Sequence, residues 1–423
     1  MDMSSIVSVS TKATLLFVCV LLLEMSVWSL FREDAFENNV HRKADSVQRA
    51  QRKFGQSPPP TPPCPSCVYS TCDPQPDSQQ DVHVTPNQTT IPITIPITDS
   101  ESVRNDSRCP TRPQSKFGSR NVVLAMGSSY KQDSLRNFAV SCSLYVKSGS
   151  CVIFRSATDK NDVATNAWIK KLPNVYFVFD GTDYDAKEAF ELVPADLRNP
   201  KSPAMTKPAL TRILAFKSFL MRHACIFDKI MNTDTRDAFF QSDPFIRITT
   251  GLYVSGELYN LRHQPHNMGW LNAIRDPADP AGTKMTDTLD TEFKIQPVIR
   301  LRPVLCSGLV AGDAGAIEAW LEAMITLIFR LKYDYQTGID QGFHNLLFLR
   351  YPNLMRPHST VIVPSLGGWM SNNYPCDANQ KIPQIYDVYR MVIPAIIHQY
   401  DRCLPLKSVV DAHFATLNKK HFS

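Results

Sequence analysis

The segment MNTDTRDAFFQSDPF, residues 231–245, places Asp234, Arg236, Asp237 and Asp243 within ten positions, directly after an apolar run. A short apolar run predicts a buried strand, and Asp234 would lie at its carboxyl end. Carboxylate oxygens are the ligands that Mg²⁺ and Mn²⁺ prefer in proteins. A bound divalent cation can in turn neutralise a departing diphosphate. The segment is therefore a candidate metal–diphosphate site.

The two nearest carboxylates have the spacing D-x-x-D, which leaves two interpretations open. In a regular strand Asp234 and Asp237 point to opposite faces, so both can reach one ion only if the strand stops near Thr233 and the chain bends. Alternatively, Asp234 caps the following turn, and Asp237 pairs with Arg236 or another basic residue. The local sequence favours neither interpretation.

Strand and helix patterns alternate from about residue 119 to the C-terminus, and these elements must position the acidic segment. Apolar runs predict strands, and helical apolar spacing predicts helices. The strands are expected at 121–127, 151–155, 175–180, 227–234 and 251–256, and the helices at 133–146, 207–223, 315–332 and from 338 onward. This alternation predicts an α/β fold with a mostly parallel sheet in one large domain, residues 119–423. Ligands of such sheets bind beyond the carboxyl ends of the strands, where Asp234 is expected.

Several segments resemble GT-A glycosyltransferases, enzymes that use nucleotide sugars, and they occur in that superfamily's order over roughly residues 120–403. DKIMNTDTRDAFFQSDPF (228–245) resembles the acidic motif of the superfamily, with D-x-x-D in place of D-x-D. The other matching segments are the helix with Arg212 and FKSFL (216–220), CSGLVAGDAGAIEAWLEAM (306–324), GIDQGFHN (338–345) and IIHQYDR (396–402). The resemblance implies a GT-A-like, Rossmann-type mixed sheet that is mostly parallel and flanked by helices.

The resemblance also implies which residues bind the cation and the nucleoside. Asp234 and Asp237, with His398 as a third ligand, would hold Mn²⁺ or Mg²⁺. Gly127 and Ser128, at the end of the first strand, would lie near the nucleoside, where glycine permits a close approach.

Other residues would contact the nucleoside-diphosphate sugar and the acceptor. Arg212 would help to bind the donor, and Ser307 and Gly308 would face the donor sugar and the acceptor. Asp340 would be the general base on the acceptor hydroxyl if transfer inverts the anomeric configuration. Gln341 would lie near the reacting carbon if the configuration is retained. The order of the segments resembles the retaining branches.

Each of these segments also has a purely structural interpretation. Residues 306–308 can form a tight turn before a helix, with Cys306 in a disulfide. Asp340 can be an exposed helix cap, and His398 can be a hydrogen-bonded core histidine. In the segment HNMGW (266–270), His266 can be a plain loop residue. Residues 267–270 can line an acceptor cleft, because aromatic rings suit sugar faces.

Two other functions compete with sugar transfer to a luminal glycan or glycoprotein. A catalytically inactive, membrane-tethered glycan-binding or scaffold protein with the same fold would explain the D-x-x-D departure. A metal-dependent phosphoester hydrolase also needs strand-end carboxylates, but the sequence has no clustered histidines or second carboxylate set for a two-metal site. The net charge of +5 over 423 residues, without a basic run, argues against nucleic-acid binding.

The N-terminal part predicts a membrane anchor followed by a stem. Residues 13–31 are apolar apart from one glutamate and long enough to span a bilayer after a short cytoplasmic tail, 1–12. A cleaved signal peptide, and hence a secreted form, is the alternative. Residues 32–118 are proline-rich and carry two glycosylation acceptors, Asn87 and Asn105. By analogy, this order predicts a single-pass type II protein of the Golgi membrane with a luminal catalytic domain.

The cysteines suit a chain of the secretory pathway. Apart from Cys19 in the apolar run, four lie between Cys64 and Cys109 and six between Cys142 and Cys403. Two even groups predict disulfides, although the sequence does not give their connectivity.

Overall fold

The structure is a computed structural model that describes residues 116–198, 202–223, 225–275, 302–365, 368–372 and 393–422, together with residues 284 and 287. The predicted tail, the membrane anchor, nearly all of the stem and both glycosylation acceptors lie outside these residues. Within the described part of the chain, no helix combines the length and the apolar character that a membrane span requires.

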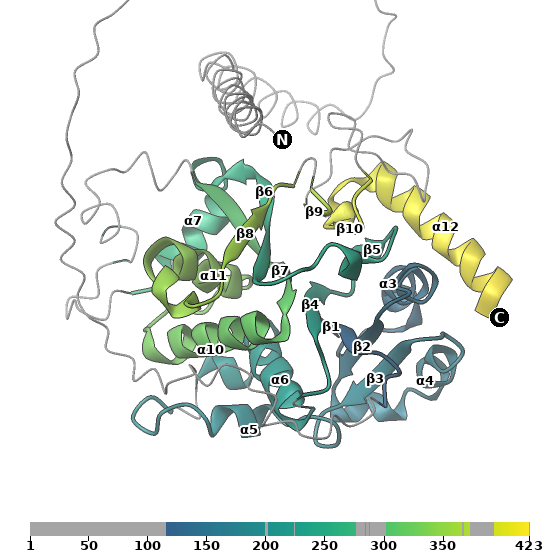
Figure 1. Ribbon diagram of the computed structural model, residues 1–423, viewed down its shortest axis with the longest axis horizontal. Coiled ribbons are helices and arrows are strands. Elements are labelled where there is room, and N and C mark those ends of the chain that lie inside the picture. Colours follow the sequence, from purple (N-terminus) through teal and green to yellow (C-terminus); the bar gives the residue numbers. More distant parts are fainter. Residues whose placement is uncertain are drawn as a thin grey trace, which may run out of the picture. The chain divides into compact units, whose positions relative to one another are not determined.

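A seven-stranded sheet organises the domain (Figure 1), with the strand order β3-β2-β1-β4-β7-β6-β8. The bounds are β1 Asn121–Met126, β2 Ser150–Arg155, β3 Val175–Phe179, β4 Lys229–Asp234, β6 Leu252–Asn260, β7 Pro303–Asp313 and β8 Thr360–Val363. Strands β3, β2, β1 and β4 are parallel, and β8 is parallel to β6. Only β7 runs antiparallel to its two neighbours among these strands. The predicted mixed, mostly parallel sheet is confirmed.

Helices flank this sheet (Figure 1). Their bounds are α3 Gln132–Tyr145, α4 Val163–Ile169, α5 Ala186–Phe190, α6 Pro208–Arg222, α7 Pro265–Asn272, α10 Ala314–Arg330, α11 Ile339–Arg350 and α12 Leu404–Phe422. Helix α3 packs against α4 and α12, whereas α6 packs against α5 and α10, and α10 packs against α11. The four predicted helices correspond to α3, α6, α10 and α11.

The central strands are buried on both faces, as continuous apolar runs predict for parallel strands. Neighbouring residues of β2 point to opposite faces of the sheet. Ile153 belongs to the core cluster that contains Phe138 of α3. Phe154 packs instead against Phe216 of α6, with ring centroids 4.8 Å apart. The two helix groups therefore cover opposite faces of the sheet.

A second sheet has three short strands, in the order β5-β10-β9. They are β5 Ala238–Phe240, β9 Met370–Asn372 and β10 Ile396–His398, and β10 is antiparallel to β5 and parallel to β9. The sequence did not predict this sheet. Its apolar residues, among them Phe239 and Ile397, are fully buried in the same cluster as α3.

Strand β7 contradicts one interpretation of the sequence. Residues 306–308 lie inside this 11-residue strand, so the tight turn considered there is wrong. The strand continues because its residues from Val304 to Gly312 are all buried between two neighbouring strands. Asn232 of β4 supports it by donating from Nδ2 to the carbonyl of Ser307 over 3.0 Å.

The cysteines agree only partly with expectation. Cys142 and Cys151 form a disulfide that joins α3 to β2. Cys225 and Cys403 each take part in a disulfide as well. Cys306 is a free, buried thiol, so the alternative that placed it in a disulfide is wrong. The six downstream cysteines therefore do not all pair with one another.

Candidate active site

Asp234 is the last residue of β4, and the parallel pairing of β1 with β4 places Met126 beside it. The carboxyl ends of both strands thus meet at one edge of the sheet. Thr235 donates from Oγ1 to the carbonyl of Met126 over 2.6 Å, which ties the chain after β4 to the end of β1. Residues 235–237 then bend before β5 begins at Ala238. The bend that D-x-x-D requires is present.

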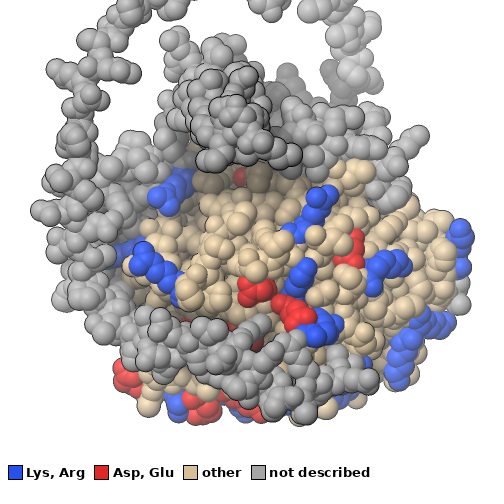
Figure 2. All heavy atoms as spheres, viewed as in Figure 1, with Lys and Arg blue, Asp and Glu red and all other residues tan. Residues whose placement is uncertain are grey.

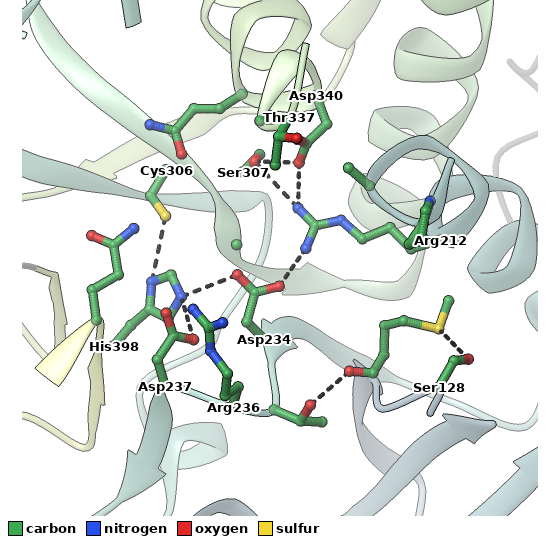
Figure 3. Close-up of a pocket in the computed structure, with 18 of the residues that line it drawn as sticks. Ser128, Arg212, Asp234, Arg236, Asp237, Cys306, Ser307, Thr337, Asp340 and His398 are labelled. Atoms are coloured by element: carbon green, nitrogen blue, oxygen red, sulfur yellow. Dashed lines mark hydrogen bonds and ion pairs between the residues drawn. The ribbon is translucent and has the colours of Figure 1, made fainter. Parts of the chain in front are cut away.

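The three-stranded sheet brings His398 to this bend, because β10 pairs with β5 so that His398 lies opposite Ala238. Its Nε2 lies 3.2 Å from Oδ2 of Asp234 and 3.4 Å from Oδ1 of Asp237 (Figure 3). One ligand atom from each of the three residues lies within 4.8 Å of the other two. Two carboxylate oxygens suit Mn²⁺ or Mg²⁺, and an imidazole nitrogen can complete the set. The three predicted metal ligands are therefore brought together.

The competing interpretation of D-x-x-D is correct in one part, because Asp237 faces a basic residue, His398. Its other parts are wrong. The carboxylate of Asp234 contacts the side chains of Arg212 and His398 and does not cap the following turn. Arg236 lies 3.7 Å from Asp401, with 61% of its side chain exposed, so its ion-pair partner is not Asp237. Both carboxylates of the motif are directed to His398.

Gly308 of β7 leaves the room that this cluster needs. A Cβ atom at this position would lie 2.5 Å from Oδ2 of Asp234 and 2.8 Å from Cε1 of His398. Such contacts are too short to tolerate, so a larger residue would displace the carboxylate or the imidazole. Gly308 therefore has a steric role beside this candidate cation site, and its predicted place beside the donor sugar stays a prediction.

Arg212 of α6 links two acidic residues of the site (Figure 3). Its Nη1 donates to Oδ1 of Asp234. Its Nη2 donates to Oδ2 of Asp340 over 2.5 Å and to Oγ of Ser307 over 3.2 Å. Burial opposes its charge, but Asp234 and Asp340 outweigh burial and raise the pKa of Arg212 above its usual range. Arg212 thus holds one oxygen of Asp234 and leaves the other directed to His398.

The electrostatics of the cluster favour positive charge between the two carboxylates. Burial raises the pKa of Asp234, but Arg212 and His398 outweigh burial and hold the pKa of this carboxyl below its ordinary value. Burial lowers the pKa of His398, whereas Asp237 and Asp234 outweigh burial and raise it well above its ordinary value. A cation at Nε2 would take the place of the proton that these carboxylates attract.

Asp340 is the second residue of α11, and it is buried. The residue before the helix is Gly338, whose φ of 90° favours glycine, and it occupies the N-cap position. The interpretation of Asp340 as an exposed cap is therefore wrong. Its Oδ2 accepts from Oγ of Ser307 over 2.8 Å as well as from Arg212.

Gln341 is oriented by two buried partners. Its Nε2 donates to Oε1 of Glu257 over 2.9 Å and to Oδ1 of Asn267 over 2.8 Å. Both amide hydrogens are then used, so Oε1 is the amide atom left for a ligand. Glu257 was not among the predicted site residues, and it lies inside β6 after an apolar run. A carboxylate inside a strand pattern was the only signal that could have identified it.

A pocket of about 630 Å³ is lined by the three acidic and histidine side chains of the cluster, by Arg212, and by Asp340 and Gln341. Ser128 and Tyr130 line it on the β1 side, and Trp270 and Tyr335 add aromatic rings. His266 lies on α7, so its interpretation as a loop residue is wrong. On the face shown in Figure 2, the described basic and acidic side chains are interspersed between larger tan areas.

Gly127 has a packing role that the sequence did not predict. It does not line the pocket, whereas Met126 and Ser128 on either side of it do. A Cβ atom on Gly127 would lie 2.6 Å from Cγ2 of Ile153 and 3.1 Å from Cδ2 of Leu135. The structure therefore gives this glycine a packing role against β2 and α3, and its place near a nucleoside stays a prediction.

No family model matches this chain, and no curated protein matches it. Among solved structures, the chain is similar to the apo structure of WbbM, a bifunctional glycosyltransferase. The match covers 74% of this chain and 53% of that chain, with 13% sequence identity and a TM-score of 0.42. The present chain therefore matches about half of the length of that chain.

Proposed function

We propose that this protein is a metal-dependent glycosyltransferase that moves a sugar from a nucleoside-diphosphate donor to a luminal glycan or glycoprotein. The observation that carries the proposal is the convergence of Asp234, Asp237 and His398 at the carboxyl end of β4, inside a pocket. Strand ends of α/β sheets are where such ligands bind. A bound Mn²⁺ or Mg²⁺ would neutralise the diphosphate as it leaves.

The protein's own residues would bind and orient the substrates around this site. Ser128 lies at the end of β1, where the nucleoside would bind. Arg212 holds Asp234 in place and supplies a positive charge near the diphosphate. Trp270 can pack against a sugar face, because an aromatic ring offers an apolar surface with little entropy to lose.

The arrangement of Asp340 and Gln341 favours retention of the anomeric configuration. Asp340 already accepts hydrogen bonds from Arg212 and Ser307. Its carboxylate therefore has a structural role and is not free to act as the general base. Gln341 presents an uncharged oxygen that can accept a hydrogen bond from a sugar hydroxyl. A retaining reaction of this kind needs no strong base from the protein on the acceptor side.

The test is donor turnover by the purified full-length protein. With Mn²⁺ and a panel of nucleotide sugars, slow release of nucleoside diphosphate from one donor is expected, and EDTA should abolish it. Asp237→Asn should abolish it too, because this change removes one ligand oxygen. Asp401→Asn is the matched control, since Asp401 pairs with Arg236 and is not one of the three ligand residues.

Two results would contradict the proposal. No nucleotide binding at any metal concentration would exclude a metal-assisted transferase. Glycan binding that persists in EDTA, without turnover of any donor, would instead support the catalytically inactive glycan-binding protein.

The proposed location is the Golgi membrane, with a single-pass type II topology and the catalytic domain in the lumen. Support comes from the apolar run 13–31 and the proline-rich segment with acceptors Asn87 and Asn105. Sensitivity of the protein to an N-glycosidase, together with retention in the membrane fraction, is expected. Complete release into the medium after cleavage would favour the secreted form.

A further inference from the structure

We propose that Asn372 is a positioning residue that makes His398 a metal ligand, through a directional chain of hydrogen bonds that starts on β6. The inference rests on the cation site of the proposed function. Asn372 is the last residue of β9, and the parallel pairing of β9 with β10 places it directly beside His398. No motif of the sequence marks it.

Hydrogen bonding fixes the orientation of the Asn372 amide. Its Nδ2 donates to Oγ of Ser255 on β6. The hydroxyl of Ser255 can donate onward to the carbonyl of Met370, 3.4 Å away. Since Nδ2 is occupied in this way, Oδ1 is the atom that faces Nδ1 of His398, at 2.6 Å. An amide oxygen can only accept, so Nδ1 of His398 carries the hydrogen of this bond.

This bond determines what the other ring nitrogen can do. When Nδ1 holds a hydrogen, the neutral imidazole has its lone pair on Nε2. That atom is the one that faces Asp234 and Asp237, at 3.2 and 3.4 Å. Metal-binding histidines commonly donate their second ring N–H to such an outer partner, which fixes both the tautomer and the ring orientation. Asn372 would supply that partner here.

The surroundings leave few alternatives to this arrangement. Asn372, Ser255 and His398 are each at most 1% exposed, so their polar atoms find their partners inside the protein. The backbone N–H of Asn372 donates to Oγ of Ser365 over 3.0 Å, which holds the strand end. Cys306 also faces Nδ1, but its sulfur is 3.5 Å away and is the weaker acceptor.

The test is a Mn²⁺ titration of the full-length protein without substrate, with free Mn²⁺ followed by electron paramagnetic resonance. Asn372→Leu keeps the approximate shape but removes the acceptor, and Mn²⁺ binding should weaken about 10- to 100-fold. Asn372→Asp restores an acceptor for Nδ1–H and should bind Mn²⁺ within a few-fold of the wild type. Ser371→Ala is the matched control, because Ser371 is buried on the same strand and its Oγ has no hydrogen-bond partner among the residues that the structure describes.

The outcomes separate this inference from the proposed function. If the wild type binds Mn²⁺ and Asn372→Leu binds it equally well, the positioning role is overturned while the cation site stands. If the Leu and Asp variants lose the same affinity, Asn372 is only a packing residue. If the wild type binds no Mn²⁺, the cation site itself fails, and the proposed function fails with it.

A second variant covers the case in which Asn372→Leu does not fold. Ser255→Ala removes the acceptor of Nδ2, so the amide becomes free to rotate and to present its nitrogen to His398. It should weaken Mn²⁺ binding several-fold. Unchanged binding in Ser255→Ala and Asn372→Asp alike, with Asn372→Leu unfolded, would overturn the directional chain.

Discussion

The seven-stranded and three-stranded sheets hold the two sides of the proposed cation site by different means. On the larger sheet, Asp234 is held by charge, because Arg212 binds one of its oxygens and also binds Asp340. On the smaller sheet, His398 is held by the amide of Asn372. Asp237 lies in the bend between β4 and β5, and these strands belong to different sheets.

Because of this difference, we expect substitutions at the two sides to change different quantities, either the free energy of unfolding or the affinity for the cation. A buried ion-pair network is strongly destabilised when one partner is removed, because a charge is left without compensation. Loss of a neutral hydrogen bond is milder and acts mainly on the group that it orients. We therefore expect changes around Arg212 to destabilise the fold, and changes that reach only His398 or the carboxylate oxygens to reduce cation binding.

The largest effect is expected for Arg212→Met. Arg212 and Asp340 are both buried, so the variant leaves the Asp340 carboxylate without its cation. The free energy of unfolding should fall by about 3–5 kcal/mol, measured by denaturant titration. Lys217→Met on the same helix is the control, since its partner Glu322 is 60% exposed and stays hydrated, and the expected loss is about 1 kcal/mol or less. Equal losses of unfolding free energy in both variants would show that the buried ion pairs of Arg212 do not hold this side of the site.

Gly308→Ala should have the next largest effect, and it should act on affinity. The added Cβ would lie 2.5 Å from Oδ2 of Asp234, so the carboxylate must move away from the cation. Displacement of a direct ligand should exceed the loss caused by an outer partner, so Mn²⁺ affinity should fall more than about 100-fold. Gly256→Ala is the matched control, because its nearest neighbour would be 3.5 Å away. Normal Mn²⁺ binding by Gly308→Ala would show that the carboxylate has another position available.

The smallest effect concerns a second buried histidine, on the side of the larger sheet. His344 of α11 accepts from Nε1 of Trp320 over 3.1 Å, and burial, with Arg212, lowers its pKa to about 3. The unfolded chain protonates this residue below about pH 6.5, whereas the folded protein resists until about pH 3. The unfolded state therefore binds more protons between these values, and stability falls as the pH is lowered through this window.

His344→Gln should make that decline shallower, as measured by unfolding free energies between pH 7 and pH 4. The same substitution at the exposed His421 should leave the decline unchanged. Identical curves for wild type and His344→Gln would show that His344 is protonated equally in both states.

The sequence predicted β1, β2, β3, β4 and β6 of the larger sheet from short apolar runs, but it missed β7 and β8. Asn121–Met126 and Lys229–Asp234 each bury their four central residues, and such runs are recognisable without knowledge of the partner strand. The smaller sheet was missed because its strands have three residues each and come from distant segments. Their pairing depends on burial in the folded core rather than on local pattern.

The same distinction applies to the site. Asp234 and Asp237 were found because charge follows an apolar run, and His398 was found by resemblance. Asn372 and Glu257 act through contacts with residues 26 and 84 positions away, and short polar residues of this kind carry no local signal. The packing role of Gly127 was not predicted, because a glycine after a strand can serve a ligand or the core equally well.

We propose that one divalent cation is held by three side chains, one from each sheet and one from the bend between β4 and β5. Anomalous diffraction from crystals soaked in Mn²⁺ tests it most directly. We expect a single manganese peak bound by Asp234, Asp237 and Nε2 of His398, with Nδ1 still hydrogen-bonded to Asn372. A manganese position that excludes His398, or no peak at this site, would contradict it.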